Sequence, residues 1–208
     1  MQDHFLVITP VGGERDLDNY INRELFASLL AIPSATRVML LRLIRGNGPS
    51  QVVIWETERW EASVTRAYDV AIGSDSASAS ALAGRPRAVY QGTARFRQTQ
   101  VVKDRCKFLL LVQMDIPLEH ENEFNNWYDS EHIPMLLKIP GWMSAVRYVL
   151  INGEVPKYLT IYELEGPGAV DRTEHEMTHR TEWYRRVRPH FENFSSLLYE
   201  QLSESQRK

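Results

Sequence analysis

The sequence has few of the features that mark secreted, membrane-spanning or nucleic-acid-binding proteins. Its 208 residues include one cysteine, Cys106, so no internal disulfide can form and a reducing compartment, the cytoplasm, is expected. No apolar run approaches the ~20 residues that cross a bilayer, and the first residues do not resemble a signal peptide. The formal net charge is −3, whereas a general nucleic-acid binder normally has an excess of basic residues. We therefore expect a soluble, cytoplasmic protein with no nucleic-acid or membrane partner.

The sequence does contain a pattern that occurs twice. The stretch "NYINRELFASLLAIP" (19–33) matches "NWYDSEHIPMLLKIP" (126–140) at six of fifteen positions, at an offset of 107 residues. Random pairing at ordinary composition would give roughly one match. The same offset aligns "VVIWETE" (52–58) with "LTIYELE" (159–165). The chain is therefore interpreted as two tandem units, residues 1–103 and 104–208.

Hydrophobic periodicity predicts the same order of elements in both units. In the first unit it predicts strands at 4–10, 36–44, 51–58 and 88–96, and helices at 14–32 and 59–72. In the second unit it predicts strands at 107–117, 142–151, 158–165 and 195–202, and helices at 119–139 and 170–187. The stretch 74–86, rich in small residues, is expected to be a surface loop, with a mobile lid as the alternative. The order β-α-β-β-α-β is that of the ferredoxin-like unit, an α+β fold.

The stretch "EFNNWYDSEHIPMLLKIPGWMSAVRY" (123–148) resembles a helix and strand of EthD-like proteins in the dimeric α/β-barrel superfamily. The clear match covers about 107–164. In that superfamily two ferredoxin-like units pair their sheets, so the resemblance implies an internal, pseudo-dimeric α/β barrel within this one chain. The superfamily includes cofactor-free monooxygenases, cyclases, isomerases, decarboxylases, lyases and haem-handling members, and its fold alone does not settle the reaction.

The helix at 119–139 carries the main candidate for a functional group. Phe124, Tyr128, His132 and Leu136 follow one another at intervals of four, which predicts a shared face turned toward the sheet. Pro134 lacks an N–H group and disturbs the helix, so an irregular backbone is expected near His132. An inward imidazole at this position can act as a general acid or base, or it can be a core histidine.

The sequence around His132 suggests a complete site. The predicted catalytic group is His132, oriented by Asp129 or Glu131, and the predicted substrate-binding residues are Tyr128, Trp127, Tyr148, Trp142 and Arg147. Strand alternation predicts that Tyr148 shares the helix-facing side with Trp142 while Arg147 faces the interface between units. The first unit has Leu25 where the second has His132, which predicts one working site, in the second unit.

Two further patterns have weaker functional interpretations. "HEMTH" (175–179) matches the H-E-x-x-H zinc pattern, but a third ligand would have to come from His190 or Glu192, beyond Pro189. We therefore expect no metal. The arginine-rich stretch "RTEWYRRVRPHF" (180–191) is expected to be a solvated face, with a clamp for a substrate carboxylate as the alternative.

These features together predict an enzyme of small-molecule metabolism without a cofactor. It would act on an aromatic or other mostly apolar acid, with lyase, isomerase or decarboxylase-type acid–base chemistry. The alternatives are a cofactor-free monooxygenase, a non-catalytic ligand-binding or stress protein, and a zinc hydrolase. The expected partner is the small-molecule substrate, and a homodimer is a further expectation.

Overall fold

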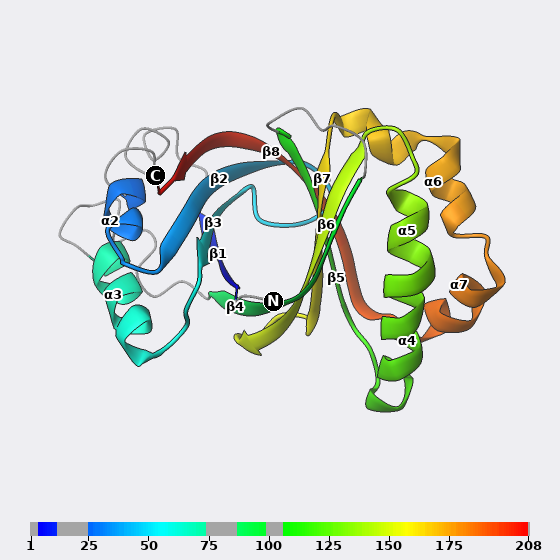
Figure 1. Ribbon diagram of the computed structural model, residues 1–208, viewed down its shortest axis with the longest axis horizontal. Coiled ribbons are helices and arrows are strands. Elements are labelled where there is room, and N and C mark those ends of the chain that lie inside the picture. Colours follow the sequence, from blue (N-terminus) through cyan, green and yellow to red (C-terminus); the bar gives the residue numbers. More distant parts are fainter. Residues whose placement is uncertain (1–3, 12–24, 74–86, 99–105, 208) are drawn as a thin grey trace. The chain divides into compact units, whose positions relative to one another are not determined.

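The computed structural model describes residues 4–11, 25–73, 87–98 and 106–207 (Figure 1). The chain divides into two compact units. Unit one comprises Met1–Gly92, Leu150–Val155 and Glu200–Lys208, and unit two comprises Thr93–Val149 and Pro156–Tyr199. The part of the first predicted helix at 14–24 and the stretch 74–86 lie outside the described residues. Within the described residues, no helix is long and apolar enough to span a membrane.

Unit one is built around antiparallel strands in the order β4-β1-β3-β2. Its strands are β1 (Phe5–Val11), β2 (Ala35–Arg45), β3 (Gln51–Thr57) and the first part of β4 (Ala88–Arg97). Its helices are α2 (Phe26–Leu30) and α3 (Ala62–Gly73), and they lie along one side of these strands (Figure 1). The core between helices and strands contains the buried Phe26, Leu29, Trp55 and Tyr68.

Unit two has the corresponding strand order, β8-β5-β7-β6. Its strands are β5 (Phe108–Asp115), β6 (Trp142–Asn152), β7 (Tyr158–Leu164) and β8 (Glu192–Gln206), of which β6 and β8 also supply residues to unit one. Helices α4 (Glu121–Trp127), α5 (Ile133–Leu136), α6 (Thr173–Thr178) and α7 (Glu182–Val187) lie along one side of them (Figure 1). The shorter elements are η2 (Leu118–His120), η3 (Tyr128–His132), η4 (Pro167–Asp171) and η5 (Arg188–His190).

The structure confirms the α+β class and all eight predicted strands. The division at residues 103 and 104, and the joining of the two units into one barrel, stay predictions. The single helix predicted at 170–187 is wrong, because the chain forms two short helices there. Thr181 begins the second of them, and its hydroxyl accepts a hydrogen bond from the backbone N–H of Tyr184 at 3.0 Å. Such a cap stabilises a helix start rather than a helix interior.

Strand β6 contains a bulge that decides which side chains face the helices. Its pairing with β7 shifts between Trp142 and Ser144, and β2 shifts against β3 between Ala35 and Arg37, which lie 107 residues earlier. A bulge inserts one extra residue and reverses the alternation of sides beyond it. Trp142, before the bulge, therefore shares the helix-facing side with Ala145, after the bulge, rather than with Ser144.

Candidate functional site

The helix that carries His132 is irregular where the sequence predicts it. Between α4 and α5, residues Tyr128–His132 form a π-type turn, and the N–H of Ile133 donates to the carbonyl of Tyr128. Pro134 follows this turn directly and cannot supply an N–H to the ordinary helical pattern. Single π turns of this kind are frequent at functional sites. Phe124, Tyr128 and His132 are all buried, so the predicted inward face is confirmed.

His132 is enclosed by aromatic rings. Its ring stacks on Trp127 with centroids 4.5 Å apart and meets the edge of Tyr128 at 5.1 Å. The side chain is 8% exposed, and its Nδ1 atom is buried without a hydrogen-bond partner among the described residues. Burial above all, and then the charges of His179, His175 and Arg147, lower the pKa of His132 to about 3. The imidazole is therefore neutral at pH 7, with one N–H group and one acceptor nitrogen.

The two neighbouring carboxylates bind other groups. Glu131 accepts hydrogen bonds from Trp127 Nε1 at 3.1 Å and from the Thr181 hydroxyl at 2.7 Å. Asp129 accepts a hydrogen bond from Arg147 Nη1 at 2.6 Å. None of these hydrogen bonds involves His132, so they do not support the expectation that Asp129 or Glu131 orients it. Instead Glu131 fixes Trp127, the ring on which His132 stacks.

Arg147 lies in the layer between helices and sheet, so its predicted position at the interface between units is wrong. Its guanidinium donates to Asp129, and also to Asn125 Oδ1 at 2.7 Å. It lies 4.7 Å above the ring of Tyr128. Tyr148, its neighbour, is buried on the opposite side of β6 and does not line the helix-facing layer as predicted. The bulge in β6 is the physical reason for both corrections.

A pair of tyrosines lies beside Arg147. The hydroxyl of Tyr162, on β7, donates to the hydroxyl oxygen of Tyr128 at 3.0 Å. Burial raises the pKa of both phenols, and hydrogen bonds from Thr160 and Tyr162 partly oppose the shift at Tyr128. Both hydroxyls stay protonated at neutral pH, and Tyr162 uses its proton in the hydrogen bond to Tyr128. Trp142 covers the edge of Tyr162 at 5.1 Å.

The residues that sequence reasoning missed are Tyr162, Thr160 and Thr181. Tyr162 and Thr160 replace Trp55 and Val53, which lie 107 residues earlier. A search for positions where an apolar residue becomes polar between the two halves would have found Thr160 and drawn attention to Tyr162. Thr181 has a recognisable helix-capping sequence, but its bond to Glu131 spans 50 residues and has no local signal.

The "HEMTH" histidines extend the aromatic cluster from His132 toward the surface. His179 is an exposed residue, with its ring 6.1 Å from His132 and 4.8 Å from His175. Partial burial, and then the charges of His175 and Arg188, lower the pKa of His179 to about 4. His175 Nδ1 lies 2.7 Å from the carbonyl oxygen of Val170.

The arrangement does not favour the zinc alternative. His190, the suggested third ligand, stacks on His120 with centroids 3.4 Å apart. Across the described ranges, no group of three or more His, Cys, Asp or Glu side chains is placed to hold a metal ion. Among His132, His175 and His179, His132 is the one whose ring nitrogen Nδ1 is buried without a hydrogen-bond partner in the described part of the chain.

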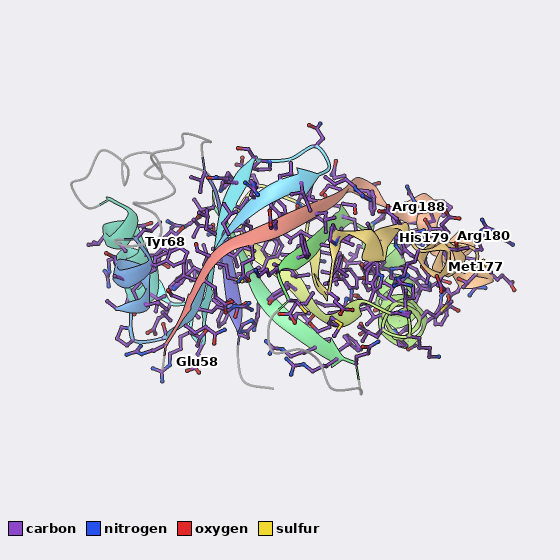
Figure 2. The ribbon with its side chains drawn as sticks, turned by 90° about the horizontal axis from the view of Figure 1, so that it is seen from above. Glu58, Tyr68, Met177, His179, Arg180 and Arg188 are labelled. Carbon is purple, nitrogen blue, oxygen red and sulfur yellow. The ribbon has the colours of Figure 1, made fainter. Side chains whose placement is uncertain are left out.

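Unit one contains a cavity at its surface. This cavity of about 340 Å³ lies near the end of α2 and the start of α3, with Ile32, Val64 and Ala67 among its apolar residues. Its charged residues are Glu58, Arg59 and Glu61, all of them exposed. Glu58 is labelled in Figure 2. No residue of the predicted site lines this cavity.

No family model matches the chain, and no curated protein matches it. Solved structures share its fold. An anthrone oxidase-like protein has a TM-score of 0.70 at 9% identity, covering 99% of this chain and 94% of that chain. A protein from Lactobacillus acidophilus that is described as a monooxygenase has a TM-score of 0.60 at 12% identity. The match covers 99% of this chain and 97% of that chain.

A ferredoxin fold protein from Listeria monocytogenes, described as related to antibiotic biosynthesis monooxygenases, has a TM-score of 0.55. It is 12% identical and covers 98% of this chain and 96% of that chain. At these identities the comparisons show the fold alone. The ferredoxin-like expectation agrees with them, while the EthD-like resemblance and the tandem organisation stay predictions.

Proposed function

We propose that the chain is a small-molecule enzyme whose site is the layer between helices and sheet in unit two. His132 would take a proton from an aromatic substrate, because the negative charge that develops on the substrate beside it would raise its pKa from about 3. The protonated Tyr128, whose oxygen accepts a hydrogen bond from Tyr162, would stabilise the resulting anion. Within this class we favour an oxygen-dependent reaction without an organic cofactor over lyase or isomerase chemistry.

The observation that carries the proposal is the state of His132. It is buried, neutral and stacked on Trp127, and its Nδ1 has no hydrogen-bond partner among the described residues. A buried polar atom without a partner costs stability, on the order of 1–3 kcal/mol, so a stability role does not explain it. A base that waits for its substrate does, because the substrate supplies the missing hydrogen bond.

Proton removal is the step that these residues can perform. An aromatic ketone with an acidic methylene group would lose a proton to His132 and become an enolate, whose oxygen would accept a hydrogen bond from the Tyr128 hydroxyl. The nearby charge of Arg147 also favours the anion. Reaction with O₂ then converts the CH₂ group to C=O and releases one water. The methylene carbon supplies all four electrons that O₂ accepts, so no separate reductant is required.

The contacts and the structural neighbours support the oxygen-dependent alternative. Lyase and isomerase chemistry usually needs an acid beside the base, but Asp129 and Glu131 are engaged elsewhere. The neighbours include proteins named for anthrone oxidase and monooxygenase activity. An electron-rich carbanion held among aromatic side chains suits a direct reaction with oxygen.

The test is oxygen uptake by the purified protein with anthrone and with an anthrone carboxylic acid. His132→Gln keeps a polar side chain of similar size and removes the base, so the rate should fall by about 10²-fold or more. His120→Gln removes a histidine that stacks on His190 instead, and its rate should stay within twofold. Product formation that continues without oxygen would instead indicate lyase or isomerase chemistry. Binding of either compound without any turnover would indicate a ligand-binding protein.

A further inference from the structure

The arginines that surround α7 differ in their partners. Arg180 pairs with Glu176 at 3.4 Å, and Arg186 pairs with Glu123 at 3.2 Å. Arg185, in α7, and Arg188, in η5, have no carboxylate within ion-pair distance among the residues that the structure describes, and of these two only Arg188 lies over aromatic rings. An arginine without an acidic partner is available to bind an anion from solution.

Aromatic rings hold Arg188 in place. Its guanidinium lies 5.2 Å from the ring centre of Phe191 and 5.4 Å from that of Phe194. These two rings stack on each other at 6.2 Å, and Phe194 is 46% exposed. A guanidinium fixed against rings keeps the N–H groups at its edge free, and these are the groups that bind a carboxylate in pairs.

Arg188 lies at the surface end of the aromatic cluster that leads to His132. It is close enough to His179 for its charge to lower the pKa of that histidine. His179 in turn contacts Tyr184 at 5.0 Å and faces His132 at 6.1 Å. Figure 2 shows His179 and Arg188 at the same end of unit two. The cluster therefore has a cation at its surface end and the unpartnered base at its buried end.

We propose that Arg188 binds a carboxylate of the substrate, and that the substrate of the His132 site is an aromatic acid. The carboxylate would replace the missing acidic partner of Arg188, while the ring system would pack along His179 and Tyr184 toward Trp127. Arg188 thus determines which substrate binds and takes no part in the reaction itself. This inference rests on the proposed function for the location of the reaction.

The test measures binding without turnover, by calorimetry, with 2-naphthoate and its uncharged analogue 2-naphthamide as probes. Arg188→Gln should weaken naphthoate binding by about 10-fold or more, as expected for loss of hydrogen bonds to a charged group. Naphthamide binding should change by less than twofold. Arg188→Lys keeps the charge but loses the fork of donors, so it should fall between the wild type and Arg188→Gln.

Arg180→Gln is the matched control, because it removes the same charge from an arginine that already has a partner. It should change naphthoate binding by less than twofold. An equal loss in Arg180→Gln and Arg188→Gln would overturn the inference, since it would indicate a general effect of surface charge. Failure of the wild type to bind naphthoate would overturn it as well.

A second readout locates the probe. Naphthoate should shift the imidazole NMR signals of His179 and His132, and unchanged signals at both would show a carboxylate bound elsewhere and overturn the inference. The two proposals can fail separately. Arg188-dependent naphthoate binding without oxygen-dependent turnover would refute only the oxygenase. Turnover that depends on His132, with naphthoate binding independent of Arg188, would refute only the carboxylate site.

Discussion

The layers between helices and sheet in the two units have similar backbones and different chemistry. At four pairs of positions 107 residues apart, the residue is apolar in unit one and polar or ionisable in unit two. The pairs are Leu25 and His132, Leu40 and Arg147, Val53 and Thr160, and Trp55 and Tyr162, and all eight side chains are buried. Unit one shows that such a layer packs well with apolar residues, so the polar residues of unit two require another explanation.

Hydrogen bonding separates His132 from the other three polar residues of this set. Arg147, Thr160 and Tyr162 each have a hydrogen-bond partner, as buried polar groups usually do. His132 has a buried ring nitrogen that lacks one in the described part of the chain. Unit one also has an unpartnered ring nitrogen, that of Trp55, but an indole N–H cannot accept a proton. The difference makes His132 the residue of this set that is costly for stability, and a role in chemistry is what we propose for it.

The largest effect on stability is expected from Trp142→Ala, which introduces the residue that unit one has at the same position, Ala35. The change leaves a cavity beside Tyr162 and removes the hydrogen bond from Trp142 Nε1 to the Ala169 carbonyl. We expect a loss of about 3–5 kcal/mol in the free energy of unfolding, measured by urea denaturation. A loss below about 1 kcal/mol would show that this part of unit two is less tightly packed than its burial indicates.

A smaller effect is expected from Arg147→Leu, again the residue of unit one. The substitution leaves Asn125 and Asp129 without their donor, and we expect it to destabilise the protein by about 2 kcal/mol. Asp129→Asn is the control, because the Asp129 side chain is 42% exposed and water can replace its partner. Its cost should stay below about 1 kcal/mol. Equal costs for the two variants would contradict the assignment of Arg147 to the buried layer.

The pH dependence of stability should differ between the wild type and His132→Leu. The pKa of His132 is lowered from 6.5 to about 3 in the folded protein. Between these values the unfolded chain binds more protons, so the contribution of His132 to stability falls as the pH falls below 6.5. It is constant above 6.5. The slope of the free energy of unfolding against pH should therefore be shallower in His132→Leu than in the wild type, by up to ~1.4 kcal/mol per pH unit.

Urea denaturation from pH 7 to pH 4 measures both slopes. The comparison between variants isolates His132, because the carboxylates and His179 titrate in both proteins. Identical slopes would mean that His132 has the same pKa in the folded and the unfolded protein, and the layer of unit two would then not be the dry environment described above.

The smallest effect is expected from Thr181→Ala. The threonine caps α7 and also donates to Glu131, which fixes Trp127. Loss of the cap should cost about 1 kcal/mol in the free energy of unfolding. Thr65→Ala is the control, since the hydroxyl of Thr65, in α3 of unit one, donates to the carbonyl of Glu61 and to no other group among the described residues. A fall in turnover for Thr181→Ala alone would show that the position of Trp127 matters for the site.

Much of the fold could be predicted from the sequence, because periodicity reports directly on burial. Alternation and apolar runs gave the eight strands, and the spacing of Phe124, Tyr128 and His132 gave the inward face of the helix. Pro134 indicated the irregular turn, since a proline removes a specific N–H.

The rest of the site depends on features that have no local signal. The bulge between Trp142 and Ser144 exchanged the predicted sides of Arg147 and Tyr148, and the sequence GWMS gives no indication of an extra residue. The bonds from Tyr162 to Tyr128 and from Thr181 to Glu131 join residues 34 and 50 positions apart. Only the three-dimensional arrangement shows that Asp129 and Glu131 bind partners other than His132.

The central claim is that His132 serves chemistry at the expense of stability, and His132→Leu at pH 7 tests it most directly. Leucine is the residue of unit one at this position, and it removes the unpartnered nitrogen. Unfolding in urea and oxygen uptake with an anthrone carboxylic acid are measured on the same preparation. We predict unchanged or higher stability together with a fall in turnover of about 10²-fold or more. A variant that loses stability and keeps its turnover would contradict the account, because His132 would then be a structural residue.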